Sequence, residues 1–463
     1  MPTTVQLTVT TAVTEANPSC VVRSAHEQGT ILIELDVRRQ PHHEMLGLDP
    51  AVELHWSKDT RTYDAQELSI FPWPICYRVT TADAWYKGPD GNRVHYTPEI
   101  VGIDARCGVA DVVKRTAVLL IVIGAIGYRR AAWLLEVLFK VSTSKSTLSR
   151  WVKDVASELP SQEEIVKLLN AQKAIKEAHL DEIFPKGGSK DAVLVLKDEH
   201  GRIMLTERVE ARDEANVRKF LEKTRALGLE IKTFFCDCYQ VYRKVIPEVF
   251  PGVQVQIDYF HVLQNVWRHL WKGFVSYRKQ VAARAEEAKT PWYKAQLKAL
   301  AFALWEHRYV IFKAEDNLSP MEQGMLVGIC EADQEVGKIR SFLSGVWNIF
   351  EDSKDDKEAR EALEKLKRQP AARGVENQQA KAVQFLEETF DQSTTYLRGG
   401  ATHRNSLSET GMRILRRLEN EHDGFRTEDS RQDFLRIYQA VKYLGWSTRG
   451  GMARPPDIPA AAA

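Results

Sequence analysis

The pattern of hydrophobic and polar positions divides the chain into segments of different character. From about residue 30 to residue 96, short apolar runs alternate with turn signals, which is typical of strands. The run ILIELDV (31–37) predicts a strand, and GPDGN (88–92) predicts a turn. We therefore expect a small β-rich N-terminal domain over residues 1–105.

Helical periodicity replaces this pattern in the next segment. It predicts three helices, over 114–126, 129–139 and 141–159. Ser142 and Ser144 are both candidates for the N-cap of the third helix. A short helix, a tight polar turn and a further helix are typical of a helix-turn-helix, which we place within 106–170.

The third of these helices offers side chains that suit a DNA backbone. Phosphate and major-groove contacts are made by basic and hydroxyl side chains at a helix N-terminus. The candidates are Lys145, Thr147, Arg150 and Lys153. The alternative interpretation is a helical linker whose basic side is simply solvated.

Apolar runs then become short again and predict a second strand-rich region over 171–262. The expected order is β-β-β-α-β-α-β. The strands cover 179–184, 191–198, 202–211, 231–238 and 253–260, and the helices cover 214–227 and 239–250. We expect the second helix to be broken near Pro247. This order is the layout of an RNase H-like core, a mixed sheet with helices on its faces.

The remaining pattern is helical. Residues 263–400 are too many for a loop inside a compact domain, so we expect an all-α insertion. Its helical runs cover 262–288, 292–312, 320–350, 359–367 and 378–396. Residues 401–450 return to the core as amphipathic helices, and the Pro- and Ala-rich segment 451–463 predicts a disordered tail. The predicted fold class is α/β, an RNase H-like mixed sheet interrupted by this insertion and preceded by a helix-turn-helix and the β-rich domain.

Two aspartates stand out within the second strand-rich region. Asp181 lies inside an apolar strand, and Asp237 ends another. Carboxylates in a sheet are costly without a partner, and two on adjacent strands repel each other. A divalent cation with oxygen ligands removes both problems. Glu182 competes with Asp181, although alternation lets only one of them point at the site. The alternative is that both aspartates merely cap neighbouring backbone.

Composition and charge narrow the class of protein. The 463 residues are too many for one ordinary core, and the net charge of +1 means that any DNA-binding face is local. No apolar run reaches the roughly 20 residues of a membrane span, and we see no signal peptide, so we expect a cytoplasmic, nucleoid-associated protein. The six cysteines lack CxxC spacing and predict free thiols. Cys76 and Cys107 with His95 remain an alternative metal site.

Three blocks of the sequence resemble a known family. They are LDEIF from residue 180, the stretch from FFCDCYQ at residue 234 to IDYFHVLQNV, and RNSLSETGMRILRRLENEHDGFR from residue 404. These blocks resemble bacterial DDE-type insertion-sequence transposases of the ISL-type group, which are related to Mutator-like transposases. The cysteine zinc ribbon with which many relatives begin is not found in this sequence, so the resemblance does not identify the module that recognises transposon ends.

The resemblance implies a catalytic and metal-binding triad of Asp181, Asp237 and Glu409. Glu419 and Glu421 are fallbacks for the third carboxylate. Such a triad implies two Mg²⁺ or Mn²⁺ ions that promote phosphodiester hydrolysis and transesterification. The partners would be transposon-end DNA and target DNA, bound by a homodimer or larger assembly.

Further residues receive supporting roles from the same resemblance. Asp258 and His261 form a DxxH that would support the catalytic carboxylates, whereas the plain alternative is a buried histidine bonded to a backbone carbonyl. Arg413 and Arg416 share the side of a helix with Glu409 and would contact the DNA strand. The insertion tryptophans stack a DNA base or, more simply, pack a core. They are Trp271, Trp292, Trp305 and Trp347.

Two other functions stay open at this stage. One is a domesticated or inactive transposase-derived protein that binds DNA without cutting it. The other is a different RNase H-like nuclease, against which the long insertion and the helix-turn-helix argue. Metal-dependent nicking separates the enzymes from a protein that only binds DNA.

Overall fold

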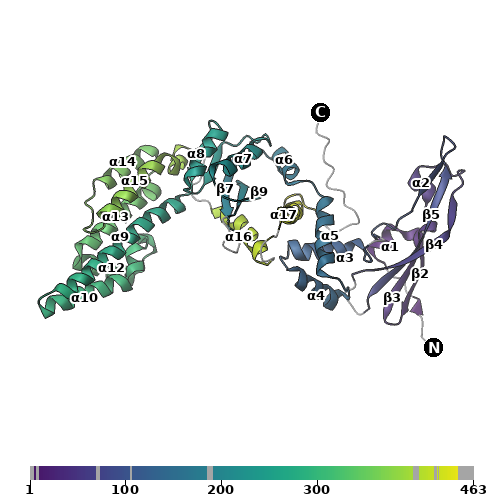
Figure 1. Ribbon diagram of the computed structural model, residues 1–463, viewed down its shortest axis with the longest axis horizontal. Coiled ribbons are helices and arrows are strands. Elements are labelled where there is room, and N and C mark those ends of the chain that lie inside the picture. Colours follow the sequence, from purple (N-terminus) through teal and green to yellow (C-terminus); the bar gives the residue numbers. More distant parts are fainter. Residues whose placement is uncertain are drawn as a thin grey trace. The chain divides into compact units, whose positions relative to one another are not determined.

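The structure is a computed structural model that divides into two compact units, and each unit is described by itself (Figure 1). It describes residues 5–6, 10–68, 73–104, 107–184, 191–399, 406–421, 425 and 427–446, with backbone alone for 5–6, 406–411 and 421. Unit 1 comprises residues 1–169, 185–188 and 413–463, and unit 2 comprises 170–184 and 189–412. The finer division into six segments stays a prediction.

Unit 1 begins with a β-rich part, as the pattern predicts. Its described strands form one mixed sheet in the order β1-β2-β3-β5-β4, with β6 paired to β5. The strands are β1 (Val5–Gln6), β2 (Val21–Glu27), β3 (Thr30–Asp36), β4 (His55–Gln66), β5 (Ile75–Lys87) and β6 (Arg93–Tyr96). The strand expected over 31–37 is β3, and the turn expected over 88–92 joins β5 to β6. Two short helices, α1 (Ala12–Ala16) and α2 (His42–Leu46), were not predicted.

The predicted helical region of unit 1 is also present. Its helices are α3 (Asp111–Val122), α4 (Tyr128–Phe139), α5 (Lys145–Ser157) and, near the C-terminus, α17 (Glu428–Tyr443). Their apolar faces bury Val118, Trp151 and Phe434 in one core. Of the two N-cap candidates the structure selects Ser144, whose hydroxyl accepts a hydrogen bond from the Thr147 backbone N–H at 3.1 Å. Helix α6 (Gln162–Gln172) was not predicted.

Unit 2 contains a five-stranded mixed sheet. Its described strands are β7 (Glu177–Ile183), β8 (Ala192–Asp198), β9 (Ile203–Val209), β10 (Thr233–Cys236) and β11 (Gln254–Ile257). The spatial order is β11-β10-β7-β8-β9. Strands β7, β8 and β9 pair antiparallel, whereas β10 runs parallel to both β7 and β11. The first strand therefore occupies the centre, and the predicted order of elements along the chain is confirmed.

Helices α7 (Glu214–Arg225) and α8 (Gln240–Val249) connect the later strands, and here one expectation was wrong. The helix expected to break near Pro247 continues through it to Val249. A proline lacks the N–H that would bond to the carbonyl one turn earlier, at Arg243. The Gln392 side chain donates to that carbonyl at 3.4 Å, so the structure replaces the lost partner from another helix.

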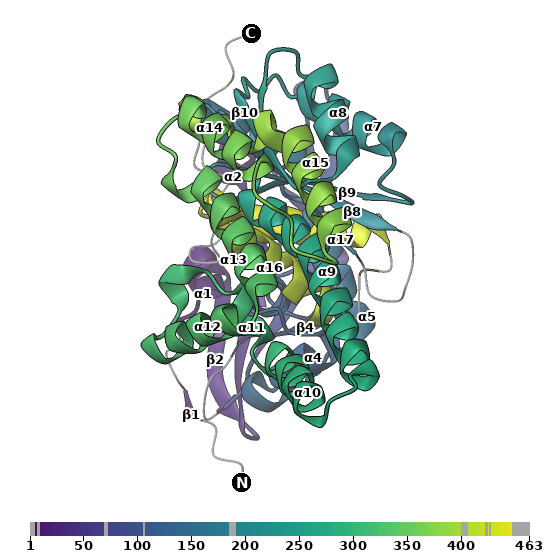
Figure 2. The ribbon, with the colours of Figure 1, turned by 90° about the vertical axis from the view of Figure 1, so that its left-hand side faces the viewer.

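The expected all-α insertion follows β11. It contains α9 (Tyr259–Glu287), α10 (Pro291–Glu306), α11 (Arg308–Phe312), α12 (Pro320–Ala332), α13 (Gln334–Trp347), α14 (Asp356–Lys367) and α15 (Glu376–Ser393). Two expected helices, 292–312 and 320–350, are each split. The second divides at Asp333, whose side chain caps α13 by accepting from the Glu335 N–H at 3.0 Å. Helix α9 is the central element and packs against α10 and α15 (Figure 2).

The return of the chain from the insertion is bonded to the edge strand β11. The fully buried Gln256 amide donates to the Ser393 carbonyl at 3.0 Å and accepts from the Tyr396 N–H at 2.8 Å. The Thr395 hydroxyl donates to the Val255 carbonyl at 2.7 Å. These bonds satisfy polar groups that burial would otherwise leave unpaired, and they join the insertion to the sheet.

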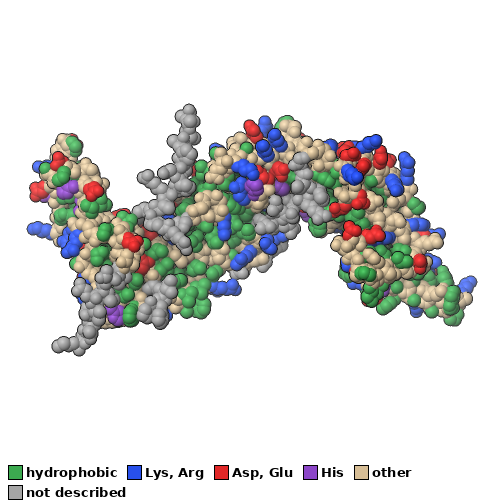
Figure 3. Space-filling model, turned by 180° about the vertical axis from the view of Figure 1, so that it is seen from behind, with side chains coloured by type: hydrophobic (Ala, Val, Ile, Leu, Met, Phe, Trp, Pro, Cys, Tyr) green, Lys and Arg blue, Asp and Glu red, His purple; other side chains and the backbone are tan. Residues whose placement is uncertain are grey.

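The surface of the insertion changes character along its length. Acidic and basic side chains mix over the part that carries α14 and α15, whereas hydrophobic side chains gather toward α10 and α12 (Figure 3). Trp292, Phe302, Met321 and Val327 are the largely exposed apolar residues there. The described part of the insertion is therefore not a uniformly basic surface.

Close packing of α9 against α15 yields a stability prediction. A Cβ on Gly273 would lie 2.4 Å from Cγ1 of Val375, so Gly273→Ala forces the two helices apart and is expected to cost about 1–3 kcal/mol. Gly324→Ala in α12 is the matched control, because nothing lies within 4 Å of its new methyl group, and it should stabilise by about 1 kcal/mol. Chemical denaturation of both variants measures the difference. Equal stabilities would contradict this packing.

Candidate active site

The two predicted aspartates lie at the ends of neighbouring parallel strands. Asp181 is near the end of β7, and Asp237 directly follows β10. His179 and Phe235 are register partners whose rings stack with centroids 4.4 Å apart, so they share a face of the sheet. Residues two positions along a strand return to the same face, which places Asp181 and Asp237 on that face.

Asp181 is held by a buried lysine that was not predicted. The Lys197 ammonium of β8 donates to Oδ2 of Asp181 at 3.2 Å, and its side chain is fully buried. A buried ammonium needs a partner because desolvation disfavours its charge. About a third of the Asp181 side chain stays exposed, so the carboxylate is accessible despite this ion pair.

Asp237 carries an incompletely compensated charge. Burial raises the pKa of Asp237, and the Asp181 carboxylate adds to the increase. The backbone N–H of Tyr239 donates to Oδ1 at 2.7 Å and lowers the pKa, as does the nearby His261. A cation bound near both carboxylates would offset this cost by stabilising their charged forms.

Glu182, the competitor of Asp181, points to the opposite face. Its side chain is 7% exposed, accepts a hydrogen bond from the Tyr242 hydroxyl at 2.7 Å and forms an ion pair with Arg212. Burial and then the charge of Asp237 raise the pKa of Glu182 to about 7. Two protein partners occupy this carboxylate, so it serves as an anchor rather than as an accessible ligand.

Arg212 links this buried carboxylate to the face that carries the aspartates. Its Nη1 contacts Glu182 and lies 3.8 Å from Oδ2 of Asp237. Arg212, Lys197 and Tyr242 were not predicted from the sequence. For Lys197 a signal existed, since it is a lone cation near the end of the apolar run AVLVLKD. For Arg212 there was none, because it lies in a loop and meets Asp237 only through the fold.

The DxxH residues lie beside Asp237. Asp258 caps α9, and its Oδ1 accepts from the Phe260 N–H at 3.0 Å. His261 follows in the first turn, close enough for its charge to favour ionised Asp237. Their supporting role stays a prediction.

The predicted third carboxylate lies on α16 (Ser406–Glu421), but the Glu409 side chain is outside the described residues, as is that of the fallback Glu421. Arg413 and Arg416 are exposed. The other fallback, Glu419, is 7% exposed and accepts from Nε of the buried Arg431 at 3.1 Å. Glu419 is therefore occupied in a core ion pair.

The available donors suit a hard divalent cation. Asp181 and Asp237 supply carboxylate oxygens, the ligands that Mg²⁺ and Mn²⁺ prefer. Among the described side chains, no group of three or more His, Cys, Asp and Glu is arranged to hold a metal ion. A complete site thus needs a further ligand, the place predicted for Glu409. The alternative set of Cys76, Cys107 and His95 likewise forms no such group.

The predicted DNA-contacting residues of α5 are accessible. Lys145, Arg150 and Lys153 are exposed, and Thr147 is partly exposed, with its hydroxyl 2.9 Å from that of Ser144. The turn before α5 contains Lys140 in the left-handed region, with φ of 57°. The spacing of the polar side chains on one helix face is thus compatible with binding to a phosphate backbone.

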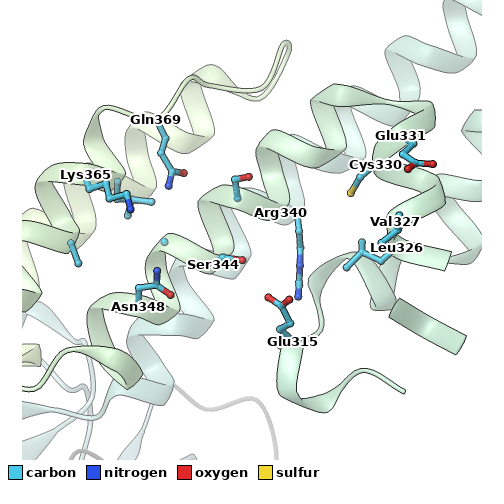
Figure 4. Close-up of a pocket in the computed structure, with 14 residues that line it drawn as sticks. Glu315, Leu326, Val327, Cys330, Glu331, Arg340, Ser344, Asn348, Lys365 and Gln369 are labelled. Carbon is cyan, nitrogen blue, oxygen red and sulfur yellow. The ribbon is translucent and has the colours of Figure 1, made fainter. Parts of the chain in front are cut away.

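A separate cavity of about 560 Å³ lies in the insertion, between α12, α13 and α14 (Figure 4). Arg340 lines it, donates to the Ile311 carbonyl at 3.3 Å and stacks over Trp347 at 5.0 Å. These contacts give Arg340 a packing role. Of the other insertion tryptophans, Trp271 packs in the core, whereas Trp292 and Trp305 are exposed.

Comparisons with known proteins point to one family. Residues 179–430, more than half of the chain, match the model of the ISL-type DDE family, whose description is "Transposase". The comparison with curated proteins finds no match. A solved structure, the Drosophila P element transposase strand transfer complex, is similar with a TM-score of 0.36 and 13% identity, over 72% of this chain and 92% of that chain. Within the described residues, none of the helices has the length and apolarity to cross a membrane.

The role of Glu419 can be tested by stability. Glu419→Ala leaves the buried Arg431 with Glu428 as its remaining acidic partner, and we expect a loss of about 3 kcal/mol in unfolding free energy. Asn420→Ala, an exposed change on the same helix, should alter it by less than about 0.5 kcal/mol. Denaturant titration measures both. An unchanged stability of Glu419→Ala would reopen this residue as a candidate ligand.

Proposed function

Because the chain belongs to the ISL-type family of DDE transposases, we propose that it cuts transposon ends and joins them to target DNA. The observation that carries this proposal is the pair Asp181 and Asp237, which end adjacent parallel strands on one face of the sheet within the matched segment. A pair of accessible carboxylates that repel each other is suited to binding divalent cations.

We infer that the sheet of unit 2 is an RNase H-like core. The support is its strand order. The first strand, β7, is central, β8 and β9 follow on one side in antiparallel pairs, and β10 and β11 follow on the other side in parallel pairs. The proposed catalytic residues lie on the first and fourth strands, which are neighbours only in this order. The insertion would separate these strands from Glu409 along the chain.

In the proposed mechanism, Asp181, Asp237 and Glu409 would hold two Mg²⁺ or Mn²⁺ ions. When bound, the ions would activate the attacking hydroxyl and neutralise charge on the phosphodiester. Lys197 fixes the orientation of Asp181, and the Tyr239 N–H fixes that of Asp237. His261 and Asp258 would support the second aspartate. No covalent link between protein and DNA is needed, so no nucleophilic side chain is assigned.

DNA would be held by unit 1 as well as by the active site. We infer that α4 and α5 form the helix-turn-helix, because Ser144 caps α5 and basic side chains line its exposed face. Arg413 and Arg416 would contact the strand that enters the site. Two transposon ends must be brought together, so we propose at least a dimer on DNA.

Cleavage of DNA that carries the sequences flanking the gene is the direct test. With Mg²⁺ or Mn²⁺, wild type is expected to leave 3′-OH ends. Asp181→Asn, Asp237→Asn and Glu409→Gln should reduce cleavage to background while DNA binding persists, because each removes a charged ligand. Gel analysis of end-labelled DNA measures the products.

Controls separate chemistry from folding. Asp316→Asn changes an exposed carboxylate of the insertion and should cut like wild type. Asp237→Asn should keep or raise the melting temperature, since it removes a partly buried negative charge that the like charge of Asp181 repels. Cleavage by either aspartate variant would sink the assignment. Tight binding without cleavage by wild type would instead favour a protein that only binds DNA.

Helix α5 predicts a second, independent result. Replacing Lys145, Arg150 and Lys153 together by Gln should weaken DNA binding and reduce the slope of log K against log salt by about 0.9 for each lost phosphate contact. Lys167→Gln, an exposed change on α6, is the control. Fluorescence anisotropy at several salt concentrations measures the slopes. An unchanged slope in the triple variant would exclude α5 from the DNA interface.

A further inference from the structure

Among the described residues, Arg212 joins the buried carboxylate of Glu182 to the more accessible carboxylate of Asp237. It lies in the loop between β9 and α7, next to Asp213, which caps α7. Its side chain is 32% exposed, so it is neither a core residue nor a freely moving surface arginine. Its position depends on contacts with residues of several elements.

The guanidinium is fixed from three directions. Nη1 is ion-paired with Glu182, whose other carboxylate oxygen accepts from the Tyr242 hydroxyl. The guanidinium carbon lies 4.1 Å from the ring centroid of Tyr239 and 5.3 Å from that of Phe184. The Tyr239 hydroxyl also donates to the Arg212 carbonyl at 2.9 Å. An arginine held in this way loses little further freedom when it binds a ligand.

Part of the guanidinium remains available. Nη1 points to Glu182 and lies 3.8 Å from Asp237, but within the described residues Nε and Nη2 make no hydrogen bond. These two nitrogens form one edge of the planar fork, and such an edge matches two oxygens of a phosphate. The edge belongs to a partly exposed side chain next to a proposed catalytic aspartate.

The charges around the site make the Nε–Nη2 edge of Arg212 important for binding DNA. Asp181 and Asp237 repel a phosphodiester, and bound ions would offset that repulsion at the reacting atoms only. Among the described residues, Lys197 and Arg212 are the two cations in ion pairs with these aspartates, and Lys197 is fully buried and cannot reach a ligand. Arg212 is the accessible one.

We propose that Arg212 binds a non-bridging oxygen of the scissile phosphodiester through its Nε–Nη2 edge, while Glu182 is the positioning residue that holds the opposite side of the guanidinium. This inference rests on the proposed function, and it adds the residue that contacts the substrate phosphate. The competing explanation is that Arg212 only compensates the buried charge of Glu182.

A thermodynamic cycle separates these explanations. The probe is the end DNA identified by cleavage, made with either a normal phosphate or one neutral methylphosphonate at the scissile position, and bound in EDTA so that no cutting occurs. The methylphosphonate should weaken binding to wild type by about 10- to 100-fold, the usual effect of losing a charge-assisted contact. It should weaken binding to Arg212→Gln far less, because the contact is already lost.

Arg218→Gln is the matched control. Arg218 of α7 is 33% exposed and pairs with two glutamates, Glu214 and Glu248, but neither is a residue of the site. This variant should show the wild-type penalty and wild-type cleavage. If Arg212→Gln fails to fold because Glu182 loses its partner, Arg212→Lys keeps the charge without the fork and should show a smaller penalty than wild type.

Each outcome decides the inference. Equal methylphosphonate penalties in wild type and the Arg212 variants would overturn the phosphate contact and leave Arg212 as a compensating charge, with the proposed function intact if wild type cuts. Absence of cleavage by wild type would overturn both, since no scissile phosphate would exist. A penalty confined to wild type and Arg218→Gln is the expected result.

Discussion

Repulsion between two carboxylates at the ends of adjacent strands is the constraint on which the candidate site depends. Asp181 and Asp237 lie on one face because β10 runs parallel to β7 and in register with it. Burial and the like charge of Asp181 raise the pKa of Asp237, so the protein alone does not fully stabilise the two ionised carboxylates. Three groups around the pair offset this repulsion. They are the Lys197 ammonium, the Arg212 guanidinium and the Tyr239 N–H.

The surrounding structure keeps these charges in place from behind. Glu182 is bound by Tyr242 and Arg212, and the same Arg212 nitrogen lies 3.8 Å from Asp237, so these contacts connect the two carboxylates. The long insertion is joined to the same sheet through Gln256 and Thr395 on the edge strand. In both arrangements, buried polar side chains bond to groups of another element, and these bonds support the sheet beneath the site.

Periodicity and turn signals were sufficient for the order of elements in unit 2, because each strand and helix there has a clear apolar pattern. They failed where distant partners intervene. Pro247 remains helical because Gln392 bonds to the carbonyl that proline leaves free. The helix expected over 320–350 is divided in two because Asp333 caps the second helix. Within a continuous helical pattern, the sequence alone does not show that this aspartate is a cap.

For the site, local chemistry identified Asp181 and Asp237, since a carboxylate within an apolar strand demands a physical explanation wherever the strand lies. The family resemblance, rather than pattern, singled out Glu409. Tertiary structure alone decided that Glu182 is an anchor, that Glu419 belongs to a core ion pair and that Arg212 reaches Asp237. Arg212 lies 30 positions from Glu182 and 25 positions from Asp237 along the chain, and strand order brings the three residues together. Strand order is set by the packing of the whole sheet, so no local sequence pattern contains it.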